Sequence, residues 1–232
     1  MGADTDRAEY RRRHIERAVT PWDCLTTTLR LVWRRLGLLL AANVLWIVLS
    51  LPIVTWPAAT AGLFYVIGRV VKEELDFEPR YARLSDFWQG VRQYGWRGSL
   101  LALIDLLGLL IIGVALRFYG QSPTEWLRWL VGPIGLIGLA WAGAQLYLYP
   151  LLIQRPERPI WELAREAFLI AISYSIYTLS LLVTATALAI GAALLAGPVL
   201  LIFFSLLAML ETVALRLVLI RRGEIVPVRP PK

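Results

Sequence analysis

Two acidic residues interrupt long apolar stretches of this sequence. Asp105 stands in the run LLALIDLLGLL, and Glu211 stands in LLAMLETVALR. A carboxyl group is costly to bury among apolar side chains, so at such a place it commonly binds a proton or a cation or accepts hydrogen bonds. Two carboxyl groups can also share acid and base roles in catalysis, but this requires them to lie close together, which the sequence does not establish.

Other polar residues lie at a similar depth in the remaining apolar runs. Each is about six to eight positions inward from one end of its run, which is roughly 9–12 Å at the rise of an α-helix. Two interpretations are open. Either these groups bond one another and hold the helices together, or Asp105 and Glu211 line a cavity, open to the cytoplasm, that holds a cation, a proton or a polar head group. The candidate polar layer consists of Asn43, Tyr65, Asp105, Gln145, Ser173 and Glu211.

Sequence motifs for enzyme chemistry are missing. The chain has neither the HExxH pattern of zinc proteases nor the GxSxG turn of serine hydrolases, and it has no glycine-rich phosphate loop. Its one cysteine, Cys24, and its one histidine, His14, both precede the first apolar run. We therefore predict that the protein is not an enzyme and has no catalytic residue, metal site or cofactor.

The elements that carry the polar layer are predicted to be membrane-spanning helices. Of the 232 residues, 58% are hydrophobic and 18% are charged, and the mean hydropathy is +0.61. Soluble domains have about 45–50% apolar and about 25% charged residues, and a spanning helix needs about 20 apolar residues. We expect an all-α polytopic bundle with six spans, at about residues 36–54, 55–71, 99–118, 130–153, 167–190 and 193–217.

The distribution of basic residues predicts the orientation of this bundle. In the six-span arrangement, 22 of the 24 Lys and Arg residues lie on one side, and only Arg117 and Arg128 lie on the other. The positive-inside rule then places both termini in the cytoplasm and the protein in the cell (inner) membrane. One alternative keeps the same orientation: residues 36–71 form a re-entrant hairpin, and four helices span the membrane.

The segments outside the bilayer are predicted to be two cytoplasmic tails and short loops. Residues 1–35 form a basic tail whose second part, from Pro21, has the spacing of an amphipathic helix resting on anionic lipid. The stretch from Ser85 to Arg97 is also expected to lie flat on the membrane. Residues 218–232 form the second tail. The net charge of +7 is assigned to the lipid surface, and no nucleic acid is expected as a partner.

Small residues recur in the run at 130–153. They allow close helix contact, either within the bundle or with a partner protein in the membrane. These candidate packing residues are Gly132, Gly135, Gly138 and Ala140.

One region also resembles a known family. The segments NVLW (43–46), LPIVT (51–55), PAA (57–59) and FWQG (87–90) are similar to the YesL-like family of bacterial multi-pass membrane proteins, a domain of unknown function. The similarity covers about residues 36–98, with Trp56 at a position where a glycine is common. Members are often encoded beside carbohydrate uptake systems, which implies an accessory role, and the resemblance supplies no site residues.

These observations predict a non-enzymatic accessory or scaffold protein associated with carbohydrate uptake. Its expected partners are the bilayer, with anionic lipid at the basic cytoplasmic face, and a membrane transporter complex. The alternative is a small transporter or channel that uses the polar layer around Asp105 and Glu211.

Overall fold

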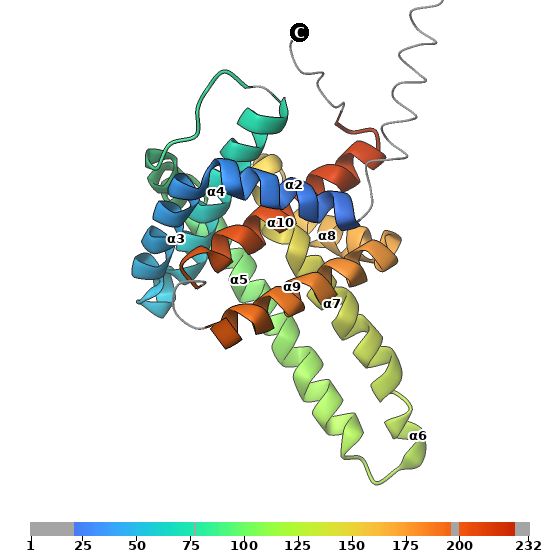
Figure 1. The fold of residues 1–232 in the computed structure, drawn as a ribbon. Helices are drawn as coiled ribbons and strands as arrows, with labels where there is room; N and C mark the ends of the chain where they lie inside the picture. Colours follow the sequence, from blue (N-terminus) through green and yellow to red (C-terminus); the bar gives the residue numbers. More distant parts are fainter. Residues whose placement is uncertain (1–20, 77, 196–199, 226–232) are drawn as a thin grey trace, which may run out of the picture.

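The computed structural model describes residues 21–76, 78–195 and 200–225, and every regular element within these ranges is a helix (Figure 1). In chain order the elements are α2 (Pro21–Arg34), α3 (Leu36–Ser50), the short 3-10 helix η1 (Ile53–Thr55), α4 (Trp56–Asp76), α5 (Ser85–Gly120), α6 (Glu125–Arg128), α7 (Val131–Gln154), α8 (Ile160–Ser173), α9 (Ser175–Leu195) and α10 (Leu200–Arg221).

The helices confirm the predicted all-α, multi-pass class. In the described ranges, five helical segments are long and apolar enough to cross a membrane: Ile53–Asp76, Ser85–Gly120, Glu125–Gln154, Ser175–Leu194 and Ile202–Arg221. Helices α2 and α3 qualify as a sixth span only if they are taken together, and a bend of 91° separates them. The number of candidate spans is therefore five to six.

Three boundaries differ from the sequence prediction. The first expected span is shorter, because α3 has 15 residues and ends at Ser50. The run at 167–190 is divided, because Tyr174 leaves the helical conformation between α8 and α9. The stretch from Ser85 to Arg97 is not a separate helix but the beginning of the 36-residue α5. At 1.5 Å per residue α5 is about 54 Å long, which exceeds a hydrocarbon core of about 30 Å.

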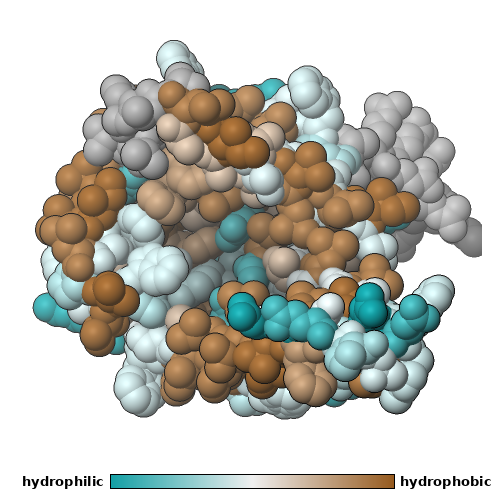
Figure 2. Space-filling view, turned by 90° about the horizontal axis from the view of Figure 1, so that it is seen from below, coloured by the Kyte–Doolittle hydropathy of each residue, from teal (hydrophilic) through white to brown (hydrophobic). Residues whose placement is uncertain are grey.

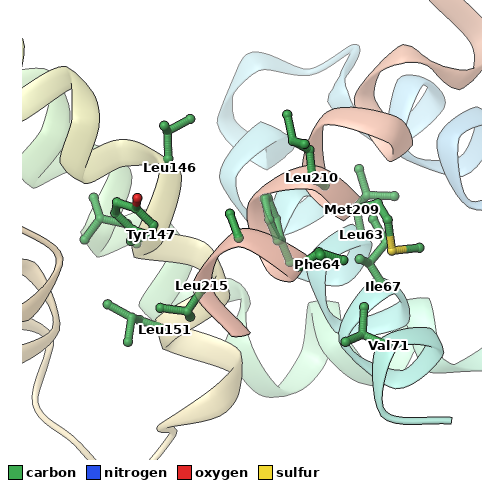
Figure 3. Close-up of a cluster of buried hydrophobic side chains, with 14 of the residues drawn as sticks. Leu63, Phe64, Ile67, Val71, Leu146, Tyr147, Leu151, Met209, Leu210 and Leu215 are labelled. Atoms are coloured by element: carbon green, nitrogen blue, oxygen red, sulfur yellow. The ribbon is translucent and has the colours of Figure 1, made fainter. Parts of the chain in front are cut away.

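Helix α10 is the centre of the packed part of the molecule. It contacts α2, α3, α4, α7 and α9. In Figure 3 it lies between α4 and α7, with Met209 among Leu63 and Ile67 of α4 and with Leu215 near Leu151 of α7. Met209 and Leu215 are completely buried. This core determines where the polar side chains of α10, including Glu211, are held.

Helices α4 and α5 approach closely because glycines line their contact. A Cβ atom added at Gly90 would lie 2.5 Å from the Cβ of Tyr65, and one at Gly62 would lie 2.9 Å from the carbonyl oxygen of Phe87. Gly98 lies in the same seam, with a Cβ position 3.0 Å from the carbonyl oxygen of Pro57. Helix contact in a bilayer depends on such close packing, so this seam fixes the start of α5 against α4.

The corner between α2 and α3 is held by ion pairs to the end of α4. Arg34 Nη1 lies 2.9 Å from Glu74 Oε2, Arg35 Nε lies 3.0 Å from Glu74 Oε1, and Arg35 also bonds Glu73. Glu73 additionally accepts a hydrogen bond from the backbone N–H of Ala82. The acidic pair at the end of α4 thus joins the α2–α3 corner to the loop before α5.

Helix α2 has two different faces. One face, which includes Leu31 and Val32, is buried, and α2 packs along α10. The opposite face exposes Trp22, Leu29 and Trp33. A helix of this kind can rest on a lipid surface with its exposed aromatic residues while it packs on the bundle with its other side.

Helices α5 and α7, joined by α6, form a hairpin that extends away from the rest of the molecule (Figure 1). We call residues 104–142 the hairpin, and we call the remainder of the described chain the packed half. Most of the large apolar side chains on α5 beyond Asp105 are exposed, including Leu106, Leu110 and Ile111. The end of the molecule opposite the hairpin tip is called the basic end, because α4, α7 and α10 finish there beside arginine residues.

Candidate functional site

Asp105 is held by two hydrogen bonds at the base of the hairpin. Its Oδ1 atom accepts a bond of 2.9 Å from Trp141 Nε1 and a second bond from Gln145 Nε2. Trp141 and Gln145 are one helical turn apart on α7, so they present both donors on one face of that helix. Both donors are neutral, and no ion pair among the described residues includes Asp105. The carboxyl group therefore joins α5 to α7 without a compensating cation.

Glu211 lies near two tyrosines of α7. Glu211 stands on α10, which packs against α7, and Tyr149 of α7 donates a hydrogen bond of 3.5 Å to the carbonyl oxygen of Gly98. Tyr147 forms a hydrogen bond of 3.0 Å with Thr178 of α9. Within the part of the chain that the structure describes, no residue forms a hydrogen bond or an ion pair with Glu211.

Asn43 belongs to a separate contact between α3 and α10. Its Oδ1 atom accepts hydrogen bonds from the backbone N–H of Ser205, at 3.1 Å, and from the Ser205 hydroxyl, at 3.4 Å. The same hydroxyl lies 2.9 Å from the carbonyl oxygen of Leu39. Asn43 and Ser205 are completely buried, so their hydrogen bonds join α3 to α10 inside the core, and we call this contact the Asn43–Ser205 clamp.

The other two residues of the expected layer lie apart from these groups. Tyr65 is half-buried in the α4–α5 seam, where its ring lies 5.7 Å from that of Tyr94. Ser173 is the last residue of α8 and is exposed. The structure therefore brings Asp105 and Gln145 together, shows no bond from Glu211 to either of them among the described residues, and distributes Asn43, Tyr65 and Ser173 over other contacts.

A buried ion pair lies nearer the basic end. Arg216 of α10 pairs with Asp76 at the end of α4 through both of its terminal nitrogens, one of them 2.5 Å from Oδ2. Arg216 is only 5% exposed. The pair borders a cavity of about 190 Å³ between α4, α7 and α10, which Lys72 and Thr212 also line. Charged walls at this position make the cavity suitable for water.

The molecule has a recess that is seen when it is viewed from the end at which the hairpin tip lies. Figure 2 shows a recess between apolar surfaces, with hydrophilic residues at its floor. The surrounding rim is largely apolar in this view. A polar floor inside an apolar rim is the arrangement expected where a membrane protein holds water or a small polar group at depth.

The four candidate packing residues of α7 have different surroundings. Gly138 faces α5, where an added Cβ would lie 3.1 Å from Ile112. Ala140 borders an apolar groove between α7, α8 and α9. Gly132 and Gly135 have nothing within 4 Å of an added Cβ. The tight glycine contacts of this fold lie instead in the α4–α5 seam, at Gly143, which meets Thr178, and at Gly108 of α5, where an added Cβ would overlap the ring of Trp141.

Sequence reasoning did not assign several of these partners. Trp141, Tyr149, Ser205 and Asp76 were not included in the expected layer. One pattern could have identified Trp141, because it stands four residues before Gln145 and shares its helical face. The same spacing applies to Tyr149, which stands four residues after Gln145 on α7. Ser205 and Asp76 come from helices far apart in the sequence, and only the fold brings them to their contacts.

The chemistry available at these sites is binding and hydrogen bonding. Among the described residues, no three His, Cys, Asp or Glu side chains are grouped so that they could hold a metal ion. Asp105 is occupied by two donors, whereas Glu211 is the acid with free bonding capacity toward its surroundings. The arrangement supports helix locking at Asp105 and proton or cation binding at Glu211.

Comparison with known proteins gives one match. Residues 39–116, which form most of α3, all of α4 and most of α5, match the family model of a protein of unknown function, DUF624. No curated protein and no solved structure matches the chain. With its several apolar helices, the chain is therefore similar over this region to DUF624 and is a membrane protein whose function that similarity leaves open.

Proposed function

We propose that this chain is a non-enzymatic accessory or scaffold protein that associates laterally with a membrane transporter complex. One observation carries the proposal: the hairpin extends from the packed half with its apolar surface uncovered. Gly132 and Gly135 on this hairpin have open space around them. Because helices associate in lipid through close packing at small residues, this surface is suited to a partner helix.

The polar groups at depth agree with a scaffold. Asp105 is bonded to Trp141 and Gln145, and Asn43 is bonded to Ser205. Each of these contacts joins two helices, and bonds between helices in a bilayer contribute about 0.6 kcal/mol on average. Side chains used in this way hold the bundle in one arrangement.

The association with carbohydrate uptake rests on the resemblance of residues 36–98 to the YesL-like family. The proposed orientation in the cell membrane, with both termini on the cytoplasmic side, rests on the distribution of Lys and Arg residues. Arg34 and Arg69 pair with Glu74 and Glu78 at and after the end of α4. Arg155 and Arg222 directly follow α7 and α10, whereas Arg117 and Arg128 lie in the last turns of α5 and α6, which meet at the hairpin tip.

Co-purification from native membranes tests the proposal. The wild-type chain is expected to bring down components of a membrane transporter, and the variant Gly132→Leu/Gly135→Leu is expected to lose them. Gly37→Leu is the matched control, because Gly37 is also an open glycine but lies on α3. Equal recovery with all three chains would show that the hairpin is not the interface, and recovery of no membrane protein by the wild type would exclude the accessory role.

A small transporter or channel is the second candidate. It is favoured by the recess with a hydrophilic floor (Figure 2) and by Glu211, which no described residue bonds. The test is uptake of sugars and cations by liposomes that contain the purified chain. The accessory role predicts uptake no higher than in empty liposomes, whereas uptake that Glu211→Gln or Asp105→Asn abolishes would establish the transporter.

A further inference from the structure

A group of arginines surrounds a concavity at the basic end. We call it the basic corner: it has a volume of about 440 Å³ and is formed by the end of α7, the following loop, α8 and the end of α10. Four arginines and three glutamates line it. The arginines are Arg155, Arg158, Arg165 and Arg222.

The glutamates of the basic corner are shared among several arginines. Glu166 lies 2.6 Å from Arg155, 3.1 Å from Arg158 and 3.7 Å from Arg222. Glu224 pairs with Arg155 and Arg222 as well. Each guanidinium has five N–H donors, so two carboxylates do not satisfy three arginines. Arg165 is exposed and has no ion pair within the described ranges. With Glu162 included, four arginines face three glutamates, so the corner carries one excess positive charge, and Arg165 has unused donors.

An apolar groove begins where the basic corner ends. It has a volume of about 320 Å³ and lies between α7, which contributes Leu136 and Ala140, and the α8–α9 segment, which contributes Ile172 and Leu179. Leu169 lines the basic corner, and Ile172 lines the groove. These two residues are three positions apart, so they are neighbours on α8, and both are exposed.

The two sites are spaced like the two parts of a phospholipid. From Gln154 at the basic end, Ala140 is about 21 Å along α7 at 1.5 Å per residue. Half of a bilayer, head groups included, is about 20–22 Å thick, so with the basic corner at head-group level Ala140 lies near the bilayer centre, where an acyl chain ends. Trp161, 72% exposed, stands beside the corner on α8, as is usual at a membrane interface.

We infer that one anionic phospholipid binds this surface. Its phosphate contacts Arg165, Arg158 and Arg222 in the basic corner, and one acyl chain lies in the groove beside Ala140 and Ile172. Charge complementarity selects an acidic head group, and the apolar lining selects a hydrocarbon chain. The inference does not depend on the accessory role, because its head-group contacts lie at the basic end, and although Ala140 belongs to the hairpin, the groove that it lines does not include Gly132 or Gly135.

Binding of defined lipids to the purified full-length chain tests this inference. Native mass spectrometry and thermal unfolding in detergent are measured with phosphatidylglycerol, phosphatidylcholine and glycerol 3-phosphate. Phosphatidylglycerol is expected to bind with one molecule per chain and to raise the melting temperature more than phosphatidylcholine does. Glycerol 3-phosphate is expected to have no effect, because it lacks the chain that fills the groove.

Two variants separate the head-group contact from the chain contact. Arg165→Gln removes one interfacial charge and should weaken phosphatidylglycerol binding about fivefold. Arg92→Gln, an exposed arginine of α5 outside the corner, is the matched control and should leave binding unchanged. Ala140→Trp fills the groove and should weaken binding of both lipids, whereas Val114→Trp, on the exposed face of α5, should not.

Each outcome decides the inference. Equal affinity for the two lipids, or an equal effect of Arg165→Gln and Arg92→Gln, would overturn an anionic lipid site. Stabilisation by glycerol 3-phosphate equal to that by phosphatidylglycerol would show a soluble phosphate site instead. If a folded Ala140→Trp variant, with a melting temperature like that of the wild type, binds phosphatidylglycerol as tightly as the wild type does, then no acyl chain lies in the groove.

Discussion

Helices α5 and α10 are both strongly apolar, yet their surroundings are opposite. The most apolar window of α5 has a mean hydropathy of 2.6 and only 6% of it is buried, whereas that of α10 has a mean hydropathy of 2.1 and 61% of it is buried. The more apolar helix is the more exposed one. In water this would be unfavourable, but in a bilayer the surrounding solvent is itself apolar, so hydropathy alone does not separate a core helix from a lipid-facing helix.

Polar and small residues distinguish the packed half, which contains α10, from the hairpin, which contains most of α5. The packed half contains the Arg216–Asp76 pair, the Asn43–Ser205 clamp and the glycine seam of α4 and α5. At the base of the hairpin, Asp105 bonds Trp141 and Gly108 packs against the ring of Trp141, whereas Gly132 and Gly135, nearer the tip, are open. Because lipid removes the hydrophobic drive for helix association, these contacts decide which helices pack. The comparison predicts that equivalent substitutions have large effects in the packed half and small effects in the hairpin beyond its base.

The largest effect is expected at the buried ion pair. Asp76→Ala leaves Arg216 buried without its partner, which should lower the free energy of unfolding by about 3 kcal/mol. Water in the adjacent cavity of about 190 Å³ keeps the loss from being larger. The measurement is reversible unfolding in mixed detergent micelles.

A matched acidic residue in the hairpin loop serves as the control. Glu125 is exposed at the start of α6, so Glu125→Ala should change stability by less than about 0.5 kcal/mol. The double variant Arg216→Met/Asp76→Leu should recover much of the loss, because it removes both charges. Equal losses for Asp76→Ala and Glu125→Ala would contradict the difference between the two regions.

The next largest effect is expected in the glycine seam. Gly90→Ala places a methyl group 2.5 Å from the Cβ of Tyr65, so α4 and α5 must separate, at a cost of about 1–3 kcal/mol. Gly135→Ala has open space and should be neutral or stabilise the helix by up to about 1 kcal/mol. Thermal unfolding in detergent compares the two variants. A loss of stability for Gly135→Ala as large as that for Gly90→Ala would contradict the close contact at Gly90 and the open space at Gly135.

Some of these features could be read from the sequence, and others depend on the fold. The apolar runs at 55–71, 99–118 and 130–153 correspond to α4, α5 and α7, because their composition suits only a spanning helix. The sequence predicts a surface helix from Pro21 ahead of a span that begins at residue 36, but it does not reveal the ion pairs of Arg34 and Arg35 with Glu73 and Glu74 at the bend between α2 and α3. The break at Tyr174 has no proline or glycine beside it to signal it.

The contacts of the candidate polar layer could likewise be predicted only in part from the sequence. Depth along each run placed Asp105 and Gln145 at one level, and a single pair of facing helices was enough to bring them together. Depth does not specify which way a side chain faces, so Ser173 is exposed at the end of α8 while Asn43 is buried against Ser205. Rotation about the helix axis is set by tertiary contacts, which one sequence does not reveal.

A smaller effect is expected at the base of the hairpin. Asp105→Leu leaves the N–H groups of Trp141 and Gln145 without an acceptor, which should cost about 1–2 kcal/mol. Asp105→Asn retains an acceptor oxygen and should cost less than about half as much as Asp105→Leu. Unfolding in detergent distinguishes the two substitutions. Equal losses would show that the charge of Asp105, and not its hydrogen bonds, stabilises the hairpin.

The smallest effect is expected on the exposed side of the hairpin. Leu110 is 60% exposed, so Leu110→Ala removes side-chain atoms that contact lipid or detergent in the folded chain. A transfer from one apolar surrounding to another has little hydrophobic gain, and the unfolding free energy should change by less than about 0.5 kcal/mol. Leu110→Ala should therefore cost less than Gly90→Ala, although it removes three carbon atoms while the glycine variant adds one. A loss above about 1 kcal/mol would mean that this side of α5 is covered in solution. Repeating the unfolding at several protein-to-detergent ratios would then show whether a second copy of the chain covers it, because only a loss due to self-association depends on that ratio.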